Sequence, residues 1–140
     1  MKKIKAYLQN ENDLKRTLIR ISHEIIEQNP DLSVIAIVGI RTRGEIIAQR
    51  ITQSISEITK TKIDNGTVDV TFYRDDFRNN FDSPKVGPSD IKFDVSGRNI
   101  ILIDDVLYTG RTIRAAMDEV FSYGRPSSIQ LGVLVDRGHR

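Results

Sequence analysis

The sequence predicts an α/β fold: an open, mainly parallel twisted sheet with helices on both faces. Runs of aliphatic residues alternate with amphipathic segments of helical period along the chain, which is the pattern of repeated strand–helix units. The aliphatic runs show no polar alternation, as expected for parallel strands buried on both faces. Right-handed crossovers then place helices on the two faces of the sheet. No repeat, low-complexity tract or domain boundary divides the 140 residues, so we expect one domain over 1–140.

The first half of the chain is expected to hold two strand–helix units. A strand or arm lies within residues 1–10, and a helix runs from residue 12 or 13 to about Gln28, where Pro30 stops it. A buried strand over Leu32–Val38 leads through a short loop into a second helix. The apolar stripe of that helix consists of Ile47, Ile51, Ile55 and Ile58.

The second half begins with a turn at Gly66 and a strand over Val68–Tyr73. Residues from about Asp75 to Gly97 show no period, and two interpretations stay open: a mobile lid over a site, or a loop that merely tolerates insertion. A buried strand at 100–103, a helix ended by Gly124 and a last strand over 128–135 complete the chain. The stripe of this last helix consists of Ile113, Ala116, Met117, Val120 and Phe121.

Two carboxylates, Asp104 and Asp105, end the strand at 100–103, and a turn with Thr109 and Gly110 follows before the helix. A helix N-terminus at the carboxyl end of a parallel strand offers free backbone N–H groups and favours a phosphate. The acid pair would accept hydrogen bonds from vicinal hydroxyls of a phosphorylated sugar and favour a nearby Mg²⁺. A lone acid pair would more often be a helix cap with a solvated acid, but the whole strand–acid–turn–helix series favours a sugar-phosphate site.

A second candidate loop, Gly39–Gly44, follows the strand over Leu32–Val38. It carries Arg41, Thr42 and Arg43 between two glycines, which is typical of an anion-binding nest. The alternative is structural, because Thr42 and Glu45 have the spacing of a capping box. Both loops are expected at the same edge of the sheet, where open α/β folds bind ligands.

The first predicted helix carries a basic stripe opposite its apolar face. The stripe consists of Arg16, Arg20 and His23, and the apolar face of Leu14, Leu18, Ile21 and Ile25. A solvated helix surface explains such a stripe, and a contact with RNA phosphates is the alternative.

Composition narrows the class of protein without fixing a function. Apolar residues make up 39% and charged residues 29% of the chain, the net charge is +2 and cysteine is absent. These values fit a globular protein without disulfides or thiolate metal sites. No signal-peptide core or membrane-length apolar run is present, so we expect a cytoplasmic location and no membrane contact. Walker A and dinucleotide-binding glycine patterns are absent, which disfavours ATPase and dinucleotide functions.

Several segments together resemble one protein family. The run Asp104–Thr112 resembles the phosphoribosyl pyrophosphate (PRPP) signature of type I phosphoribosyltransferases. The wider similarity, from about Leu14 onward, is to the PyrR group of bifunctional pyrimidine-operon attenuation regulators and uracil phosphoribosyltransferases. It rests on the segments Gly39–Gly44, Asp69–Asp76, Asp104–Thr112, Gly124–Leu131 and Val135–Arg140.

The resemblance implies a type I phosphoribosyltransferase fold and conversion of uracil and PRPP to UMP and pyrophosphate with Mg²⁺. It also implies UMP- or UTP-dependent binding of a pyrimidine-operon mRNA leader, and a homodimer or higher homo-oligomer. Asp104 and Asp105 would serve the ribose hydroxyls, near a Mg²⁺ carried by PRPP and not bound directly by the protein. The implied 5-phosphate cradle is the backbone of Val106, Leu107, Tyr108, Thr109, Gly110, Arg111 and Thr112.

The remaining implied roles are binding of pyrophosphate, closure of a segment over PRPP and binding of RNA. Thr42 and Arg43, helped by Arg41, would hold pyrophosphate, and Arg137 would lie beside pyrophosphate or base. The segment 74–97 would close over PRPP. Arg20 and His23 match the RNA-facing helix of the group.

Two departures from the group limit these implications. Ile19 stands where its members commonly carry threonine in the RNA-facing helix. The sequence given also stops at Arg140, before the segment that forms a C-terminal hood over uracil in this group. Three functions therefore stay open: a uracil phosphoribosyltransferase that is also a regulator, a regulator that uses the site only as a sensor, and a phosphoribosyltransferase for another base.

Overall fold

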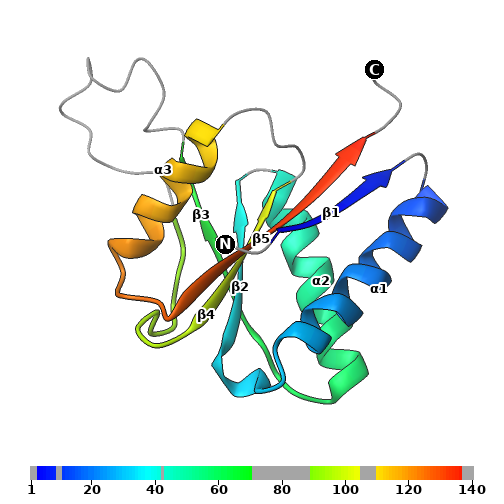
Figure 1. The fold of residues 1–140 in the computed structure, drawn as a ribbon, viewed down its shortest axis with the longest axis horizontal. Helices are drawn as coiled ribbons and strands as arrows, with labels where there is room; N and C mark the ends of the chain where they lie inside the picture. Colours follow the sequence, from blue (N-terminus) through cyan, green and yellow to red (C-terminus); the bar gives the residue numbers. More distant parts are fainter. Residues whose placement is uncertain (1–2, 9–10, 42, 71–88, 105–109, 137–140) are drawn as a thin grey trace.

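The protein is built on a parallel sheet with helices on both faces (Figure 1). The structure is a computed structural model that describes residues 3–8, 11–41, 43–70, 89–104 and 110–136, without the side chains of 3–8, 110–112 and 135–136. Within these residues, five strands form one sheet in the order β1-β5-β4-β2-β3, and each neighbouring pair is parallel. The predicted class and the open parallel sheet are confirmed.

The elements follow each other as strand–helix units. The strands are β1 (Lys3–Leu8), β2 (Ile35–Ile40), β3 (Asp64–Val68), β4 (Asn99–Asp104) and β5 (Ser128–Asp136). The helices are α1 (Glu11–Gln28), α2 (Arg43–Thr59) and α3 (Gly110–Phe121), with a short 3-10 helix, η1 (Leu32–Val34), before β2. The predicted first helix, the strand at 100–103 and the last strand are confirmed to within two residues.

Helices α1 and α2 cover one face of the sheet (Figure 1). Their buried side chains pack against alternate residues of the central strands, including Ile101 and Ile103 of β4. The helix residues of this cluster are Leu18, Ile21, Ile25, Ala48, Ile51 and Ile55. Fully burying one such isoleucine contributes roughly 1.5–3 kcal/mol. Ile58, expected on the same stripe, is 41% exposed, because it lies near the end of α2 beyond this cluster.

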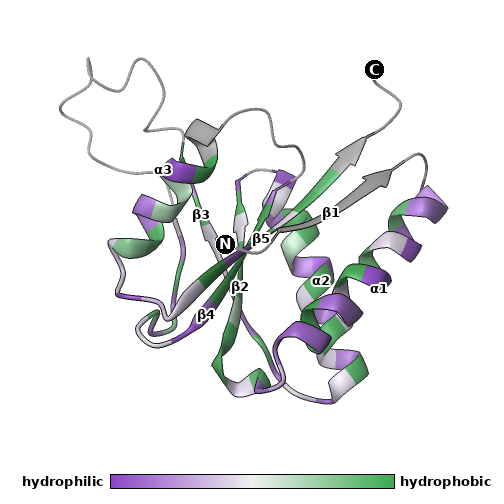
Figure 2. Ribbon diagram, in the orientation of Figure 1, coloured by the Kyte–Doolittle hydropathy of each residue, from purple (hydrophilic) through white to green (hydrophobic). Residues whose placement is uncertain are grey.

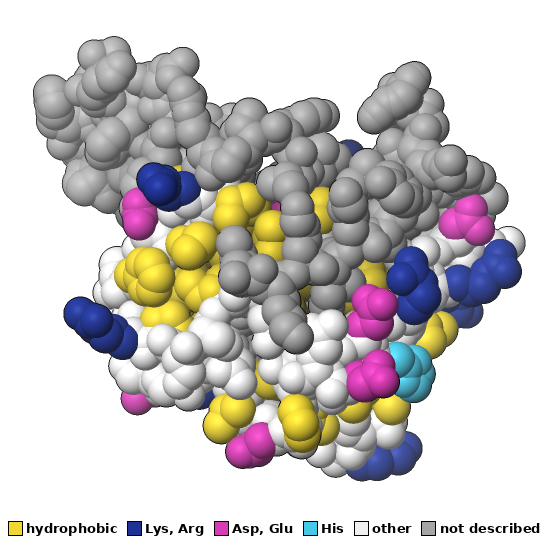
Figure 3. Space-filling model, viewed as in Figure 1, with side chains coloured by type: hydrophobic (Ala, Val, Ile, Leu, Met, Phe, Trp, Pro, Cys, Tyr) yellow, Lys and Arg dark blue, Asp and Glu magenta, His cyan; other side chains and the backbone are white. Residues whose placement is uncertain are grey.

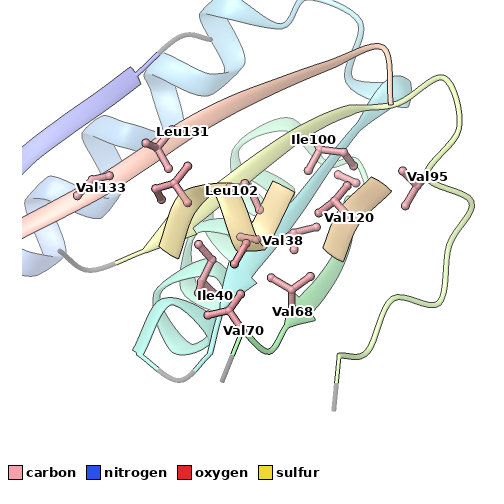
Figure 4. Packing of buried hydrophobic residues seen from close by; sticks show 14 residues of the cluster. Val38, Ile40, Val68, Val70, Val95, Ile100, Leu102, Val120, Leu131 and Val133 are labelled. Carbon is pink, nitrogen blue, oxygen red and sulfur yellow. The ribbon is translucent and has the colours of Figure 1, made fainter. Parts of the chain in front are cut away.

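Helix α3 covers the opposite face of the sheet and contacts β3. Ile113, Ala116 and Val120 belong to one buried cluster with Ile100 and Leu102, the other alternate residues of β4. Figure 4 shows this cluster, which also includes Val38, Val68, Leu131 and Val133. Because β4 is buried on both faces, its aliphatic run has no polar alternation, and Figure 2 shows this hydrophobic centre between the more polar outer surfaces of the helices.

Two predicted boundaries near the first half are wrong. The segment expected as strand from Leu32 begins instead with η1, because the side chain of Asp31 accepts hydrogen bonds from the Ser33 backbone N–H (3.0 Å) and hydroxyl (2.6 Å). Gly66 is not a turn residue but lies inside β3, paired with Val38. A Cβ at Gly66 would lie 3.0 Å from the Asp90 carbonyl oxygen, so the glycine lets a later segment pass close over β3.

That later segment, 89–97, is packed against the α3-side core. Thr67 and Asp90 exchange two backbone hydrogen bonds of 2.8 and 3.1 Å, and Val95 is fully buried. Ile91 and Phe93 pack on the same cluster. The segment runs back along β3 to the amino edge of the sheet, so the expectation of a lid reaching Gly97 is wrong for this part. The strand expected over Val68–Tyr73 is wrong at its start, because β3 ends at Val68 and residues 69–70 are not part of a strand. Residues 71–88, with most of the expected loop, lie outside the described residues.

A buried amide pair joins α1 to the sheet. Asn29, just after α1, and Gln130 of β5 are 3% and 8% exposed, and their side chains donate to each other over 2.9 and 3.2 Å. Asn29 also donates to the Ile25 carbonyl (2.8 Å). Buried amides are tolerated when their hydrogen bonds are made, and this pair fixes the end of α1 over β5.

Candidate functional site

The two predicted loops follow neighbouring strands, whose carboxyl ends lie at the same edge of the sheet. Strands β2 and β4 are paired in register, with Gly39 opposite Ile103, so their carboxyl ends lie side by side. Helix α2 begins at Arg43, three residues after β2, and α3 begins at Gly110, six residues after β4. Two helix N-termini thus open at one edge, an arrangement that favours anions.

Gly44 brings the start of α2 directly onto the end of β4. A Cβ at Gly44 would lie 3.1 Å from the Asp104 Cα and closer still to the Ile103 carbonyl oxygen. Gly39 performs the same function on β2, where a Cβ would lie 2.7 Å from the Glu45 Cα and 2.8 Å from the Ala48 Cβ. The glycines of the Gly39–Gly44 loop therefore allow close packing of the first turn of α2 against two strands.

Asp104 is the last residue of β4 and is only 9% exposed. Arg43 begins α2, beside Gly44, and its side chain is exposed. The structure therefore brings the Arg43 end of the second loop to the Asp104 end of the first. Seven of the predicted site residues lie outside the described residues: Thr42, Asp105, Val106, Leu107, Tyr108, Thr109 and Arg137. Gly110, Arg111 and Thr112 form the first turn of α3, as the helix start predicted there requires.

Arg41 belongs to the loop after β2, and its largely buried side chain reaches β3. Its Nε donates to Glu45 Oε1 over 3.0 Å, and its Nη2 donates to Thr67 Oγ1 over 3.0 Å. Sequence reasoning noted Glu45 only as a capping residue and missed Thr67. The Arg41–Glu45 spacing of four residues was the available sequence signal, whereas the contact with Thr67 needed the strand register.

The carboxylates of the site do not form a metal cage within the described part of the chain. Among these residues no group of three His, Cys, Asp or Glu side chains is placed to hold a metal ion. Two described carboxylates lie at this edge: Asp104 at the end of β4, and Glu45 in the first turn of α2, where it accepts from Arg41. Carboxylate oxygens are ligands and hydrogen-bond acceptors that suit Mg²⁺ and sugar hydroxyls.

The basic stripe lies on the exposed side of α1. Arg16, Arg20 and His23 are all exposed, as predicted. Asp13 lies 3.5 Å from Arg16, and Glu24 lies 3.9 Å from Arg20. Figure 3 shows basic and acidic side chains mixed on this side of the molecule. Ile19, beside the stripe, is 43% exposed.

Among the described helices, none combines the length and the hydropathy that a membrane-spanning segment requires.

Comparisons with known proteins agree with this architecture. The phosphoribosyl transferase domain family model matches residues 3–140. The bifunctional protein PyrR of Clostridioides difficile (strain 630) is 50% identical over 136 residues, which cover 97% of this chain and 77% of that protein. The bifunctional protein PyrR of Thermoanaerobacter sp. (strain X514) is 50% identical over 138 residues, which cover 99% of this chain and 78% of that protein.

Solved structures show the same fold at low sequence identity. A hypoxanthine-guanine phosphoribosyltransferase from Bacillus anthracis superposes with a TM-score of 0.69 at 18% identity, over 98% of this chain and 76% of that one. A purine phosphoribosyltransferase from Pyrococcus horikoshii superposes with a TM-score of 0.65 at 24% identity, over 92% of this chain and 76% of that one. Paired strands thus bring two loop starts to one sheet edge, the family model matches residues 3–140, and relatives are 50% identical. The chain therefore belongs to the phosphoribosyltransferase family and, within it, to the PyrR group.

Proposed function

We propose that the protein transfers the phosphoribosyl group of PRPP to uracil, giving UMP and pyrophosphate, and also regulates pyrimidine-operon transcription by binding the mRNA leader. The observation that carries the enzymatic part is the contact of Gly44 with Ile103 and Asp104. This contact joins the anion-favouring start of α2 to the carboxylate that ends β4, and the start of α3 follows six residues later. A substrate with a phosphate at one end, a diphosphate at the other and a diol between them fits that combination.

The sugar and its 5-phosphate would occupy the end of β4 and the start of α3. Backbone N–H groups between Val106 and Thr112 would hold the 5-phosphate, aided by the helix dipole. Asp104 and Asp105 would accept hydrogen bonds from the ribose hydroxyls. The buried position of Asp104 supports this role, because a carboxylate in a low-dielectric place forms strong hydrogen bonds and favours positive charge on the ribose ring.

The diphosphate would occupy the loop after β2. Thr42 and Arg43, next to Arg41, would hold it at the start of α2, and Arg137 would approach pyrophosphate or base. Mg²⁺ fits as a companion of PRPP near Asp104 and Asp105, where it neutralises charge on the diphosphate. The protein residues would then position the substrates, exclude water and stabilise the developing charges, with no obligatory general base.

The test of the enzymatic part is incubation of the protein with PRPP, Mg²⁺ and one base at a time, followed by measurement of pyrophosphate release. The proposal predicts release with uracil. Release only with a different base would favour the alternative of a phosphoribosyltransferase for that base. Absence of release with every base, together with uridine-nucleotide binding, would favour a sensor site in a regulator.

The regulatory part rests on the α1 stripe of Arg16, Arg20 and His23, which is exposed and therefore accessible to RNA phosphates. UMP or UTP in the nucleotide site would promote this binding. The protein would act in the cytoplasm, where PRPP and nascent transcripts occur together. Assembly into a homodimer or higher homo-oligomer belongs to the same proposal, and light scattering of the purified protein tests it.

A further inference from the structure

Three side chains at the carboxyl edge form what we term the Arg41 clamp: Arg41, Glu45 and Thr67. The Arg41 guanidinium donates to Glu45 and to Thr67, each over 3.0 Å. The side chains of Arg41 and Glu45 are 23% and 27% exposed. Hydrogen bonds between ionised groups that are partly shielded from water are stronger than those at an open surface. The clamp therefore ties the first turn of α2 to β3.

The β3 end of the clamp is held by backbone contacts. Thr67 is 5% exposed and lies opposite Gly39 in the β2–β3 pairing. It also exchanges backbone hydrogen bonds of 2.8 and 3.1 Å with Asp90. The Arg41 backbone N–H donates to the Val68 carbonyl over 2.9 Å, which extends the β2–β3 ladder by one residue. Thr67 is thus a fixed point, and Arg41 is fixed to it by backbone and side chain.

The short turn between Arg41 and Gly44 is consequently held at both ends. The clamp fixes Arg41, and close packing against Ile103 and Asp104 fixes Gly44. The start of α2, which includes Arg43, therefore has a fixed place relative to both β3 and β4. A binding segment that is fixed before the ligand arrives loses less conformational freedom on binding, and small displacements of such a segment have large effects on reaction rates.

We propose that Glu45 and Thr67 are positioning residues that, through Arg41, hold the start of α2 in the position that receives the diphosphate of PRPP. The inference rests on the proposed phosphoribosyltransferase function. Glu45 lies beside the positive charge of Arg41, so the clamp uses this guanidinium internally and leaves the diphosphate to the start of α2. Removal of either acceptor frees the guanidinium and loosens the start of α2.

The test compares paired variants in the uracil assay. Glu45→Ala and Thr67→Val remove the acceptors, whereas Glu45→Gln and Thr67→Ser keep an oxygen at the same place. We expect the first pair to raise KM for PRPP about tenfold, as for one lost charge-assisted hydrogen bond, with KM for uracil unchanged. The second pair restores KM for PRPP to within about twofold, since each retained oxygen still accepts from Arg41.

A matched control lies at the opposite edge of the sheet. Arg98 donates to Asp64 over 2.9 Å, a contact of similar geometry that joins the amino ends of β4 and β3. Asp64→Ala is expected to lower the melting temperature without changing KM for PRPP. Circular dichroism of each variant separates a general loss of stability from a local effect.

The outcomes distinguish the clamp from the function on which it rests. A wild-type protein without PRPP turnover contradicts the proposed function and the clamp with it. An active wild type whose Glu45→Ala and Thr67→Val variants keep the wild-type KM for PRPP contradicts the clamp alone. An increase of both KM values, or an equal effect of Asp64→Ala, also contradicts it, because the role would then be general stability.

Discussion

Gly44 at the start of α2 lies against Asp104 at the end of β4, and a Cβ on Gly44 would be only 3.1 Å from the Asp104 Cα. The two residues are 60 positions apart in the sequence. Their contact places the loop that follows β2 beside the acid that ends β4. The proposed sugar-phosphate site depends on this contact, because it brings a diphosphate loop and a diol-binding carboxylate to one substrate.

Gly44→Ala is expected to displace the first turn of α2, because the new methyl group would meet the backbone of Ile103 and Asp104. Such overpacking typically costs about 1–3 kcal/mol in the free energy of unfolding. Denaturant unfolding measures this change, and pyrophosphate release measures the loss of activity. Gln49→Ala, on an exposed position of the same helix, should stay within about 0.5 kcal/mol of wild type. Equal stability of the two variants would show that the contact is not tight.

Asp104→Asn combined with Asp105→Asn is expected to abolish PRPP-dependent UMP formation while the protein remains folded. Loss of an electrostatic contact to the reacting centre typically lowers turnover by at least about 100-fold. Steady-state kinetics and circular dichroism provide the two measurements. Asp118→Asn, on the exposed side of α3, serves as the control and should keep full turnover. Turnover near wild type in the double variant would refute the assignment of the acid pair.

Arg20→Ala combined with His23→Ala is expected to weaken binding of the pyrimidine-operon leader RNA and to reduce its salt dependence, because phosphate contacts release counterions. PRPP affinity should not change, since the stripe lies on α1 away from the ends of β2 and β4. An RNA titration at two fixed salt concentrations measures both effects. Lys62→Ala removes an exposed charge beside β3 as the control. RNA affinity equal to wild type in the double variant would remove the regulatory role of this helix.

Gln130→Leu is expected to destabilise the protein by about 1–3 kcal/mol, because Asn29 would lose its buried partner. Asn29→Leu combined with Gln130→Leu should recover part of that loss, because no amide then remains buried without its pair. Denaturant unfolding of the two single variants and the double variant gives the coupling energy between the residues. Strict additivity of the three values would mean that the reciprocal amide bonds contribute nothing.

Much of the fold was predictable because local patterns in this chain agree with tertiary structure. The aliphatic run at 100–103 has no polar alternation, and β4 is buried on both faces. The stripe of α1 has helical period, and Leu18, Ile21 and Ile25 are buried. The helix starts at Arg43 and Gly110 were expected from the loops that precede them, and with them the opening of two helices at one edge of the sheet.

The errors arose where long-range contacts override local signals. Glycine is a typical turn residue, yet Gly66 lies in β3. The segment after Ser89 passes so close to it that a side chain would not fit there. Ile91, Phe93 and Val95 alternate as a buried extended segment does, but the two prolines and the glycine shortly before them concealed that pattern. The contact of Arg41 with Thr67 depends on the pairing of β2 with β3, which no local spacing encodes.

The most direct test of the central claim is a crystal structure of the protein with bound UMP. The account predicts the UMP phosphate at the start of α3 and the ribose hydroxyls within hydrogen-bond distance of the Asp104 carboxylate. A nucleotide bound elsewhere on the protein, with the ends of β2 and β4 unoccupied, would contradict it.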